Sequence, residues 1–202
     1  MVILYGSMGV GMFLLNFSSP QNFQPFILIS VITSAALIPI LLTKKKPPTF
    51  KRIKAMTLKN LYEASPFGMV SSFFYGTIQA ALFTLLAVYA TSMNFTILEI
   101  SIVTFLLAVS GAVSQFPVGK ISDMYDRRLV IVVSTFGAAL FALLAILVSR
   151  QMYLPDGLAT SKTWFYVFLI LFSFCSLPMF SLILAHTNDS VSYTHLRAHE
   201  TE

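Results

Sequence analysis

The chain alternates between long apolar stretches and short polar or charged segments. A helix needs about 20 residues to cross a hydrocarbon core of roughly 30 Å. Six stretches reach or approach that length, and the first of them is short for a span: 2–17, 26–42, 66–92, 95–118, 129–149 and 164–185. The pattern predicts an all-α fold, a polytopic bundle of about six transmembrane helices.

Composition supports a lipid-facing surface. Hydrophobic residues make up 56% of the 202 residues and charged residues only 10%, whereas an average soluble domain has about 25% charged residues. Too few polar side chains remain to cover a water-exposed surface, so we expect the lipid bilayer as a partner. The single cysteine, Cys175, has no second cysteine for a disulfide within the chain and leaves the redox compartment open.

Lysine and arginine are concentrated in two connections. Residues 43–65 hold seven of the thirteen and residues 119–128 hold three, whereas 150–163 holds two. Positive residues are retained on the cytoplasmic side, and helices that cross alternately place both rich connections on the same side. We therefore expect both connections to be cytoplasmic. The basic residues do not follow an aromatic-studded face, so we expect no nucleic-acid partner.

The 43–65 connection is also the best candidate boundary within the chain. It is longer than the usual connection of about 4–6 residues, and Pro47 and Pro48 interrupt it. We interpret it as a basic cytoplasmic linker between two bundles. A juxtamembrane loop attracted to anionic lipid is a compatible interpretation.

Charge is densest in the segment GKISDMYDRR, residues 119–128. Gly119 permits a sharp exit from the preceding helix, and Asp123 is placed to accept hydrogen bonds from amides at the start of the next helix. Exposed ion pairs are worth only about 0–1 kcal/mol, so stability is a weak reason for the cluster. A latch that holds two bundles in one arrangement and releases them in another explains it better.

The run of Gly119, Asp123, Arg127 and Arg128 between two apolar stretches resembles the G-x-x-x-D-(R/K)-x-G-(R/K)-(R/K) signature of the major facilitator superfamily. Met124 replaces the usual basic residue and Asp126 the usual glycine, which favours the degenerate second copy of the signature, between helices 8 and 9. The wider text, with LLNFSSP, SQFPVGKISDMYDRR and AHTNDS, is similar to YcaD-type bacterial members.

The resemblance implies a fragment that covers helices 5–10 of a twelve-helix protein. Residues 1–42 would be the last two helices of the N-terminal bundle, and 43–65 the central linker. Residues 66–191 would be the first four helices of the C-terminal bundle. Apolar periodicity stops near the end, and we expect 192–202 to be a non-native tail.

The resemblance also implies an activity and a location. We expect secondary active transport of an unidentified small solute by alternating access, in a multi-pass protein of the bacterial cytoplasmic (inner) membrane. The full-length protein would be monomeric, the fragment alone inactive, and proton coupling is left open. Gly119, Asp123, Arg127 and Arg128 would form a conformational latch, with the partner of Asp123 near residues 1–5.

Uncharged polar side chains are the candidates for solute binding, because none of the six stretches carries an acidic, basic or histidine residue at mid-span. The best group shares one face of the predicted helix 66–92, at spacings of three and four: Ser72, Tyr75, Gly76, Gln79 and Phe83. We expect this face to line a substrate cavity. Helix packing through small residues, with Gln79 hydrogen-bonded to a neighbour, explains the pattern equally well.

The alternative class of function is a non-transporting membrane sensor or scaffold, or a membrane-embedded enzyme subunit. An enzyme would need a nucleophile with a base, paired carboxylates or a metal cluster at membrane depth, and the sequence offers none of these. We therefore expect no enzyme activity, with no catalytic residue, no metal and no cofactor.

Overall fold

The computed structural model describes residues 2–16, 22–43, 57–151 and 158–200. The elements are α1 (Val2–Phe13), a 3₁₀ turn η1 (Leu14–Asn16), α2 (Gln24–Leu42), α3 (Leu58–Ala64), α4 (Pro66–Ser92), α5 (Ile97–Met124), α6 (Arg127–Gln151), α7 (Leu158–Ser176) and α8 (Met179–Glu200). The predicted all-α membrane bundle is confirmed. Most of the basic linker, residues 44–56, lies outside the described residues, as do residues 201–202 at the end of the predicted tail.

Four stretches are long and apolar enough to cross a membrane: 66–92, 97–124, 127–151 and 161–190. The first has the predicted limits, whereas each of the other three extends beyond the predicted apolar limits at one or both ends. A helical backbone continues into polar sequence wherever its side chains can reach water. Helices α1 and α2 are apolar but shorter. The tail does not interrupt α8, which continues to Glu200.

The stretch predicted as one span, 164–185, is two helices that meet at Leu177 and Pro178. Proline has no amide hydrogen and its ring clashes with the preceding turn, so α7 ends at Ser176. Helix α8 restarts with a bond from the amide of Leu182 to the carbonyl of Pro178, at 3.2 Å. The break is firmly packed: the Leu177 side chain lies on Gly111 of α5, where an added Cβ would come within 2.7 Å of Leu177 Cβ.

Local signals set the other boundaries. Thr96 and Glu99 form a capping box at the start of α5, in which each side chain accepts a hydrogen bond from the backbone amide of the other residue, at 2.8 and 3.2 Å. Asn94 adopts φ 57° in the turn before it, a left-handed conformation that asparagine tolerates well. Pro66 occupies the first turn of α4, where its missing amide costs nothing.

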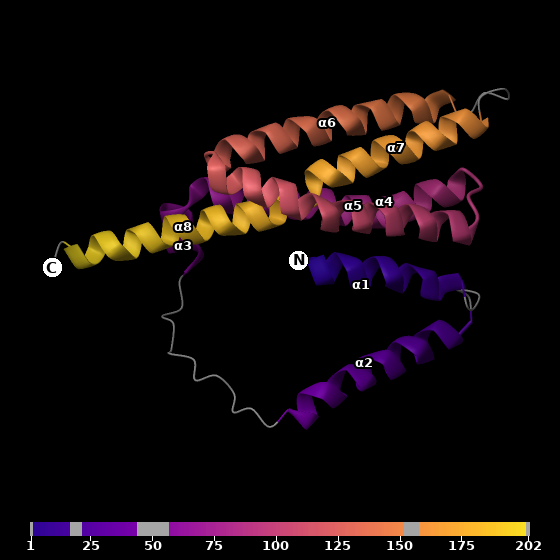
Figure 1. Ribbon diagram of the computed structural model, residues 1–202, viewed down its shortest axis with the longest axis horizontal. Coiled ribbons are helices and arrows are strands. Elements are labelled where there is room, and N and C mark those ends of the chain that lie inside the picture. Colours follow the sequence, from indigo (N-terminus) through magenta and orange to yellow (C-terminus); the bar gives the residue numbers. More distant parts are fainter. Residues whose placement is uncertain (1, 17–21, 44–56, 152–157, 201–202) are drawn as a thin grey trace.

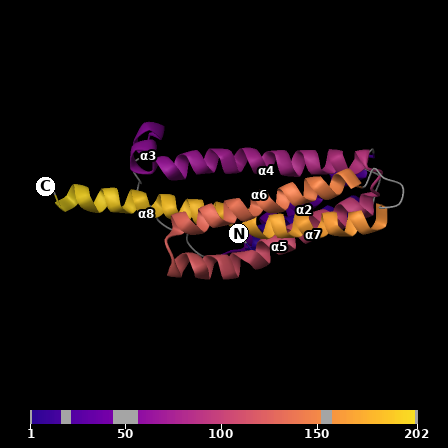
Figure 2. The ribbon, with the colours of Figure 1, turned by 90° about the horizontal axis from the view of Figure 1, so that it is seen from above.

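Helices α5, α6 and α7 run side by side, with α8 continuing beyond the break (Figures 1 and 2). One buried cluster joins α4–α7 around Phe95, Leu107 and Phe165, and a second joins α4, α5, α6 and α8 around Tyr75, Ile131 and Ile183. Between α4, α6 and α7 runs an apolar groove of about 530 Å³. The bundle therefore has two cores, one on either side of the break.

Helix α1 packs along α5, whereas α2 lies apart from the bundle (Figure 1). Gly9 allows the close approach of α1, since a Cβ there would lie 3.1 Å from Ala108. The ring of Phe13 meets Phe105 edge-on, at 5.2 Å between centroids. Helix α2 is apolar on all sides and nearly all its described side chains are exposed, which is typical of a membrane helix that faces lipid or further helices.

Candidate functional site

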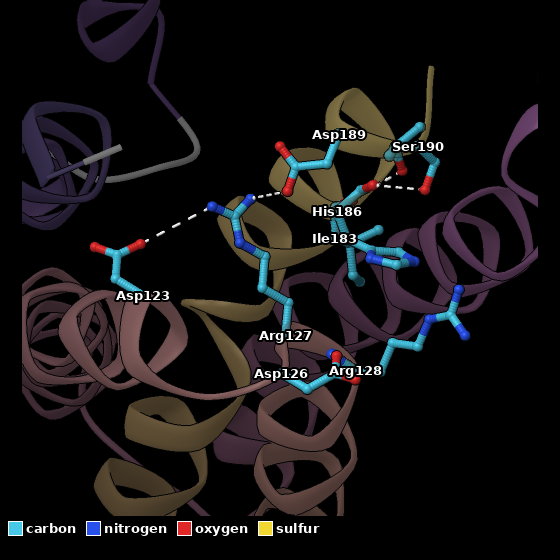
Figure 3. Close-up of polar contacts among 9 residues, drawn as sticks. Asp123, Asp126, Arg127, Arg128, Ile183, His186, Asp189 and Ser190 are labelled. Carbon is cyan, nitrogen blue, oxygen red and sulfur yellow. Dashed lines mark hydrogen bonds and ion pairs between the residues drawn. The ribbon is translucent and has the colours of Figure 1, made fainter. Parts of the chain in front are cut away.

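The charged cluster centres on Arg127, at the start of α6 (Figure 3). Its Nη1 lies 2.7 Å from Oδ2 of Asp189 on α8, and its Nη2 lies 3.9 Å from Oδ1 of Asp123 on α5. The Arg127 side chain is 29% exposed, whereas those of Asp189 and Asp123 are 51% and 76% exposed. Arg127 therefore connects three helices, and Asp189 is its closer and better shielded partner.

Asp126 caps α6. Its Oδ1 accepts from the amide of Arg128 at 2.9 Å, and its carbonyl accepts from the amide of Val130 at 3.1 Å. This geometry satisfies amides that have no partner within the helix. The expectation that Asp123 would bind these amides was wrong: α5 continues to Met124, so Asp123 lies in the last turn of α5, and Asp126 is the residue that caps α6.

Gly119 lies inside α5 rather than at a sharp exit, so that expectation was also wrong. Its φ is not positive, and an added Cβ would meet nothing within 4 Å. Pro117 removes only one backbone hydrogen bond, and the helix continues past it until the amide of Tyr125 bonds the carbonyl of Ile121. Gly119 is therefore not part of the ion-pair geometry.

Residues 2–5 do not supply the partner that was expected for Asp123. They begin α1, and Tyr5 hydrogen-bonds at the middle of the bundle, to the carbonyl of Leu177. The ion pair of Asp123 is with Arg127, four residues along its own chain. Residue 1 lies outside the described part of the chain. In this arrangement the cluster joins α5, α6 and α8, and the sequence analysis missed Asp189 as its partner.

A polar hollow of about 400 Å³ surrounds these charges, lined by Ser122, Asp123, Tyr125, Asp126, Arg127, Arg128, His186, Asp189 and Ser190. Arg128 points away from Arg127 (Figure 3). His186 stacks edge-on against Phe67 at 5.3 Å between ring centroids, so its ring is held between α8 and the start of α4. Three of the four predicted latch residues thus share one hollow.

The five residues of the predicted substrate face do not share one environment. Tyr75 is 7% exposed and donates to the carbonyl of Leu177 at 3.4 Å, and it accepts a hydrogen bond from Gln79 Nε2. Ser72 is exposed and bonds the carbonyl of Gly68 in its own helix. Gly76 is exposed and Phe83 is partly buried. Gln79 Oε1 is buried with no hydrogen-bond partner, which leaves one polar atom of this face free to bind.

The groove between α4, α6 and α7 lies beside this predicted face. Its α4 lining consists of Ile78, Ala81, Leu82, Leu85, Leu86 and Tyr89. None of the five predicted residues is among them. Helical periodicity placed those five on a common face, but it could not show which neighbouring helices that face would meet.

Buried hydroxyls on α5 and α7 serve helix packing. Ser173 donates to the carbonyl of Leu107 at 2.6 Å, and Ser110 donates to the carbonyl of Ile170 at 2.8 Å. Small hydroxyl side chains allow helices to approach closely and satisfy themselves on the neighbouring backbone. These residues therefore hold α5 against α7 and are not available to a solute.

A second ion pair at the opposite end of the bundle was not predicted. Lys162 of α7 lies 3.1 Å from Glu99 of α5, with its ammonium 4.5 Å from the centre of the Phe95 ring. The signal that could have identified the pair is that Glu99 and Lys162 both begin apolar stretches that run from the same side.

Comparison with known proteins gives a family and one distant relative. The sequence matches the Major Facilitator Superfamily over residues 2–198. It is 32% identical over 87 residues to the uncharacterized MFS-type transporter YfkF of Bacillus subtilis (strain 168), a match that covers 42% of this chain and 22% of that protein. The chain thus spans well under half of the relative it matches. No solved structure matches significantly.

Proposed function

Because the chain belongs to the Major Facilitator Superfamily, we propose that it is part of a secondary active transporter that moves a small solute across a bacterial cytoplasmic membrane by alternating access. The observation that carries this proposal is the position of Arg127, which binds carboxylates of two other helices at one end of membrane-length helices. Exposed ion pairs are worth about 0–1 kcal/mol. Such contacts can be exchanged between two arrangements without a large barrier.

We propose that Asp123, Arg127, Arg128 and Asp189 form the conformational latch. Gly119 lies one turn before Asp123 in α5. In the described part of the chain, Arg127 holds the end of α5 to α8. Helices α5, α6 and α8 would all belong to the C-terminal bundle, so the latch would act within it. A rearrangement that separates α5 from α8 must break the 2.7 Å pair with Asp189 and leave Arg127 to water or to a new carboxylate. The weaker pair with Asp123 would then be the local alternative partner.

The division of the chain is proposed on the same basis. Helices α1 and α2 would close the N-terminal bundle, 43–65 would be the cytoplasmic linker, and α4–α8 would open the C-terminal bundle. The separate position of α2 is compatible with this division, since an apolar helix can be covered by lipid or by other helices. Residues 192–202 would be a non-native tail, and the nearest subgroup the YcaD-type members.

For the solute site we propose the polar part of the α4 face, Tyr75 and Gln79, with Ser72, Gly76 and Phe83 around it. The support is the unpartnered Oε1 of Gln79, because a buried polar atom without a partner costs about 1–3 kcal/mol unless a ligand or water satisfies it. The transporter would work as a monomer, with proton coupling left open.

Two-sided accessibility of Gln79 tests the proposal against a sensor or scaffold. Gln79→Cys is made in the full-length protein with Cys175→Ala, and labelled with a small charged maleimide in right-side-out and inside-out vesicles. A transporter exposes this position to each side in turn, so labelling is expected from both. Ile78→Cys, next in the helix and 49% exposed, faces the apolar groove and lipid and should resist the charged reagent. Labelling of Gln79→Cys from one side or neither contradicts alternating access.

A further inference from the structure

The backbone carbonyl of Leu177 accepts hydrogen bonds from two tyrosine hydroxyls. Tyr5 of α1 lies 3.3 Å and Tyr75 of α4 lies 3.4 Å from the carbonyl oxygen. Leu177 itself is 1% exposed and stands in the break between α7 and α8. A carbonyl oxygen has two lone pairs, so each tyrosine can have its own acceptor site. Four segments of the chain, α1, α4, α7 and α8, are therefore joined at one oxygen.

The two tyrosines are held very differently. Tyr75 belongs to the buried cluster that includes Met179 and Ile183, its ring lies 5.9 Å from that of Phe180, and its hydroxyl accepts from Gln79. Tyr5 is equally buried, but it is carried by α1, a short helix whose other buried residue is Gly9 and which packs chiefly along α5. Movement of α1 would carry Tyr5 away, whereas Tyr75 is fixed by α8.

Because the Leu177 carbonyl has two donors, movement of α1 away from the bundle costs less free energy. Leaving a buried acceptor with no partner costs more than the loss of one hydrogen bond between satisfied groups. When Tyr5 departs, the Leu177 carbonyl keeps its bond from Tyr75, so no backbone group is orphaned in the apolar interior. Without Tyr75, the same departure would leave the carbonyl unpaired.

We propose that the Leu177 carbonyl is a releasable joint, in which Tyr75 is the permanent donor and Tyr5 the donor that leaves when α1 separates from α5. The purpose of the joint rests on the proposed function, in which α1 belongs to the bundle that moves. Its geometry does not depend on transport, and neither does its test.

Ala108 provides the readout. It is 1% exposed and lies beneath α1 at Gly9, so a cysteine there reacts with a small maleimide only when α1 lifts away. Ala108→Cys is placed in the full chain in native membranes, alone and with Tyr5→Phe, Tyr75→Phe or Tyr62→Phe. The last is the matched control, because Tyr62 is 51% exposed on α3. The native thiol of Cys175, which packs beside Gly137, reports general unfolding in the same sample.

The joint predicts opposite effects of the two buried tyrosines. Tyr5→Phe should raise the labelling rate of Ala108→Cys by about two- to tenfold, the range for one lost hydrogen bond. Tyr75→Phe should lower it at least twofold, because release of α1 would then orphan the carbonyl. Tyr62→Phe should change nothing, and Cys175 labelling should stay constant throughout.

A purely structural role predicts a different result. If the tyrosines only fill space or add stability, both buried variants should raise the rate together. That outcome, or no change with either variant, overturns the joint whether or not the protein transports a solute. If Cys175 labelling rises in Tyr5→Phe or Tyr75→Phe, that variant is replaced by Tyr5→Leu or Tyr75→Leu. If the variants at both positions then increase the labelling rate of Ala108→Cys, the joint is again rejected.

Discussion

Arg127 and Asp189 form an ion pair at 2.7 Å between residues 62 positions apart, one at the start of α6 and the other in the middle of α8. The guanidinium also reaches Asp123, at 3.9 Å. The central charged residue of a sequence motif is thus bound to a carboxylate outside the motif. Asp189 is therefore expected to interact with Arg127 more strongly than Asp123 does.

Asp189→Asn should shift the arrangement of α5 and α8 more than Asp123→Asn. The Asp189 pair is shorter and its carboxylate is less exposed, 51% against 76%, so solvent screens it less. In the full-length protein we expect transport to fall with Asp189→Asn at matched protein levels, and to fall less with Asp123→Asn. Equal rates for wild type and both variants would reduce the cluster to a topological anchor.

Asp126→Ala should destabilise the first turn of α6 by about 0.5–2 kcal/mol, because the amide of Arg128 loses its acceptor. Asp126→Asn should retain most of the stability, since asparagine caps helices about as well as aspartate. Hydrogen exchange of amides 128–130 measures the effect directly. Equally fast exchange in Asp126→Asn and Asp126→Ala would show that charge, rather than capping, is what Asp126 contributes, since both variants lack the charge.

Gly111→Ala should lower the thermal unfolding temperature in detergent, because the new methyl group would occupy the volume of Leu177. Overpacking of this kind costs typically about 1–3 kcal/mol. Gly119→Ala is the matched control in the same helix: nothing lies within 4 Å of its added Cβ, and alanine is the better helix former by about 1 kcal/mol. A similar loss of stability in both variants would mean that Leu177 is not tightly seated on α5.

Glu99→Gln and Lys162→Met should each lower stability modestly, by about 0.5–1 kcal/mol, through loss of the partly exposed ion pair. Glutamine keeps the capping box with Thr96, so Glu99→Gln isolates the charge. Lys162→Met also removes the contact with the Phe95 ring. In a double-mutant cycle the two effects should be less than additive; full additivity would show that the charges do not interact.

The sequence predicted a helix and its limits correctly where a long, purely apolar stretch determined them. The apolar stretch 66–92 and helix α4 have the same limits, because lipid imposes both length and polarity on a span. The break at Leu177 was missed although Pro178 was visible, since a proline within an apolar stretch can either kink or divide a helix. A divided helix also leaves carbonyls at the break without a helical donor, so it needs donors from other helices; here Tyr5 and Tyr75 supply them to Leu177.

Only part of the candidate site could be predicted from the sequence, because some of its contacts join residues that are far apart along the chain. Local charge spacing identified Arg127 and Asp123, which do pair, but Asp189 comes close only through the fold. The capping role was given to Asp123 and not to Asp126, because a few residues decide where α5 ends and apolar periodicity does not locate a helix end in a polar segment. Spacing likewise placed Tyr75 and Gln79 together but could not show that Leu177 would be their neighbour.

The central claim is that the Arg127 cluster biases two arrangements of a transporter. Distances between spin labels at Thr43→Cys, at the end of α2, and Lys120→Cys, near the end of α5, test it in the full-length protein with Cys175→Ala in lipid bilayers. Double electron-electron resonance should resolve two distance populations, and Arg127→Gln should change their ratio by roughly 2- to 30-fold, the range for loss of two ion pairs worth up to about 1 kcal/mol each. A single distance, or two populations whose ratio is the same with and without Arg127, would contradict the account.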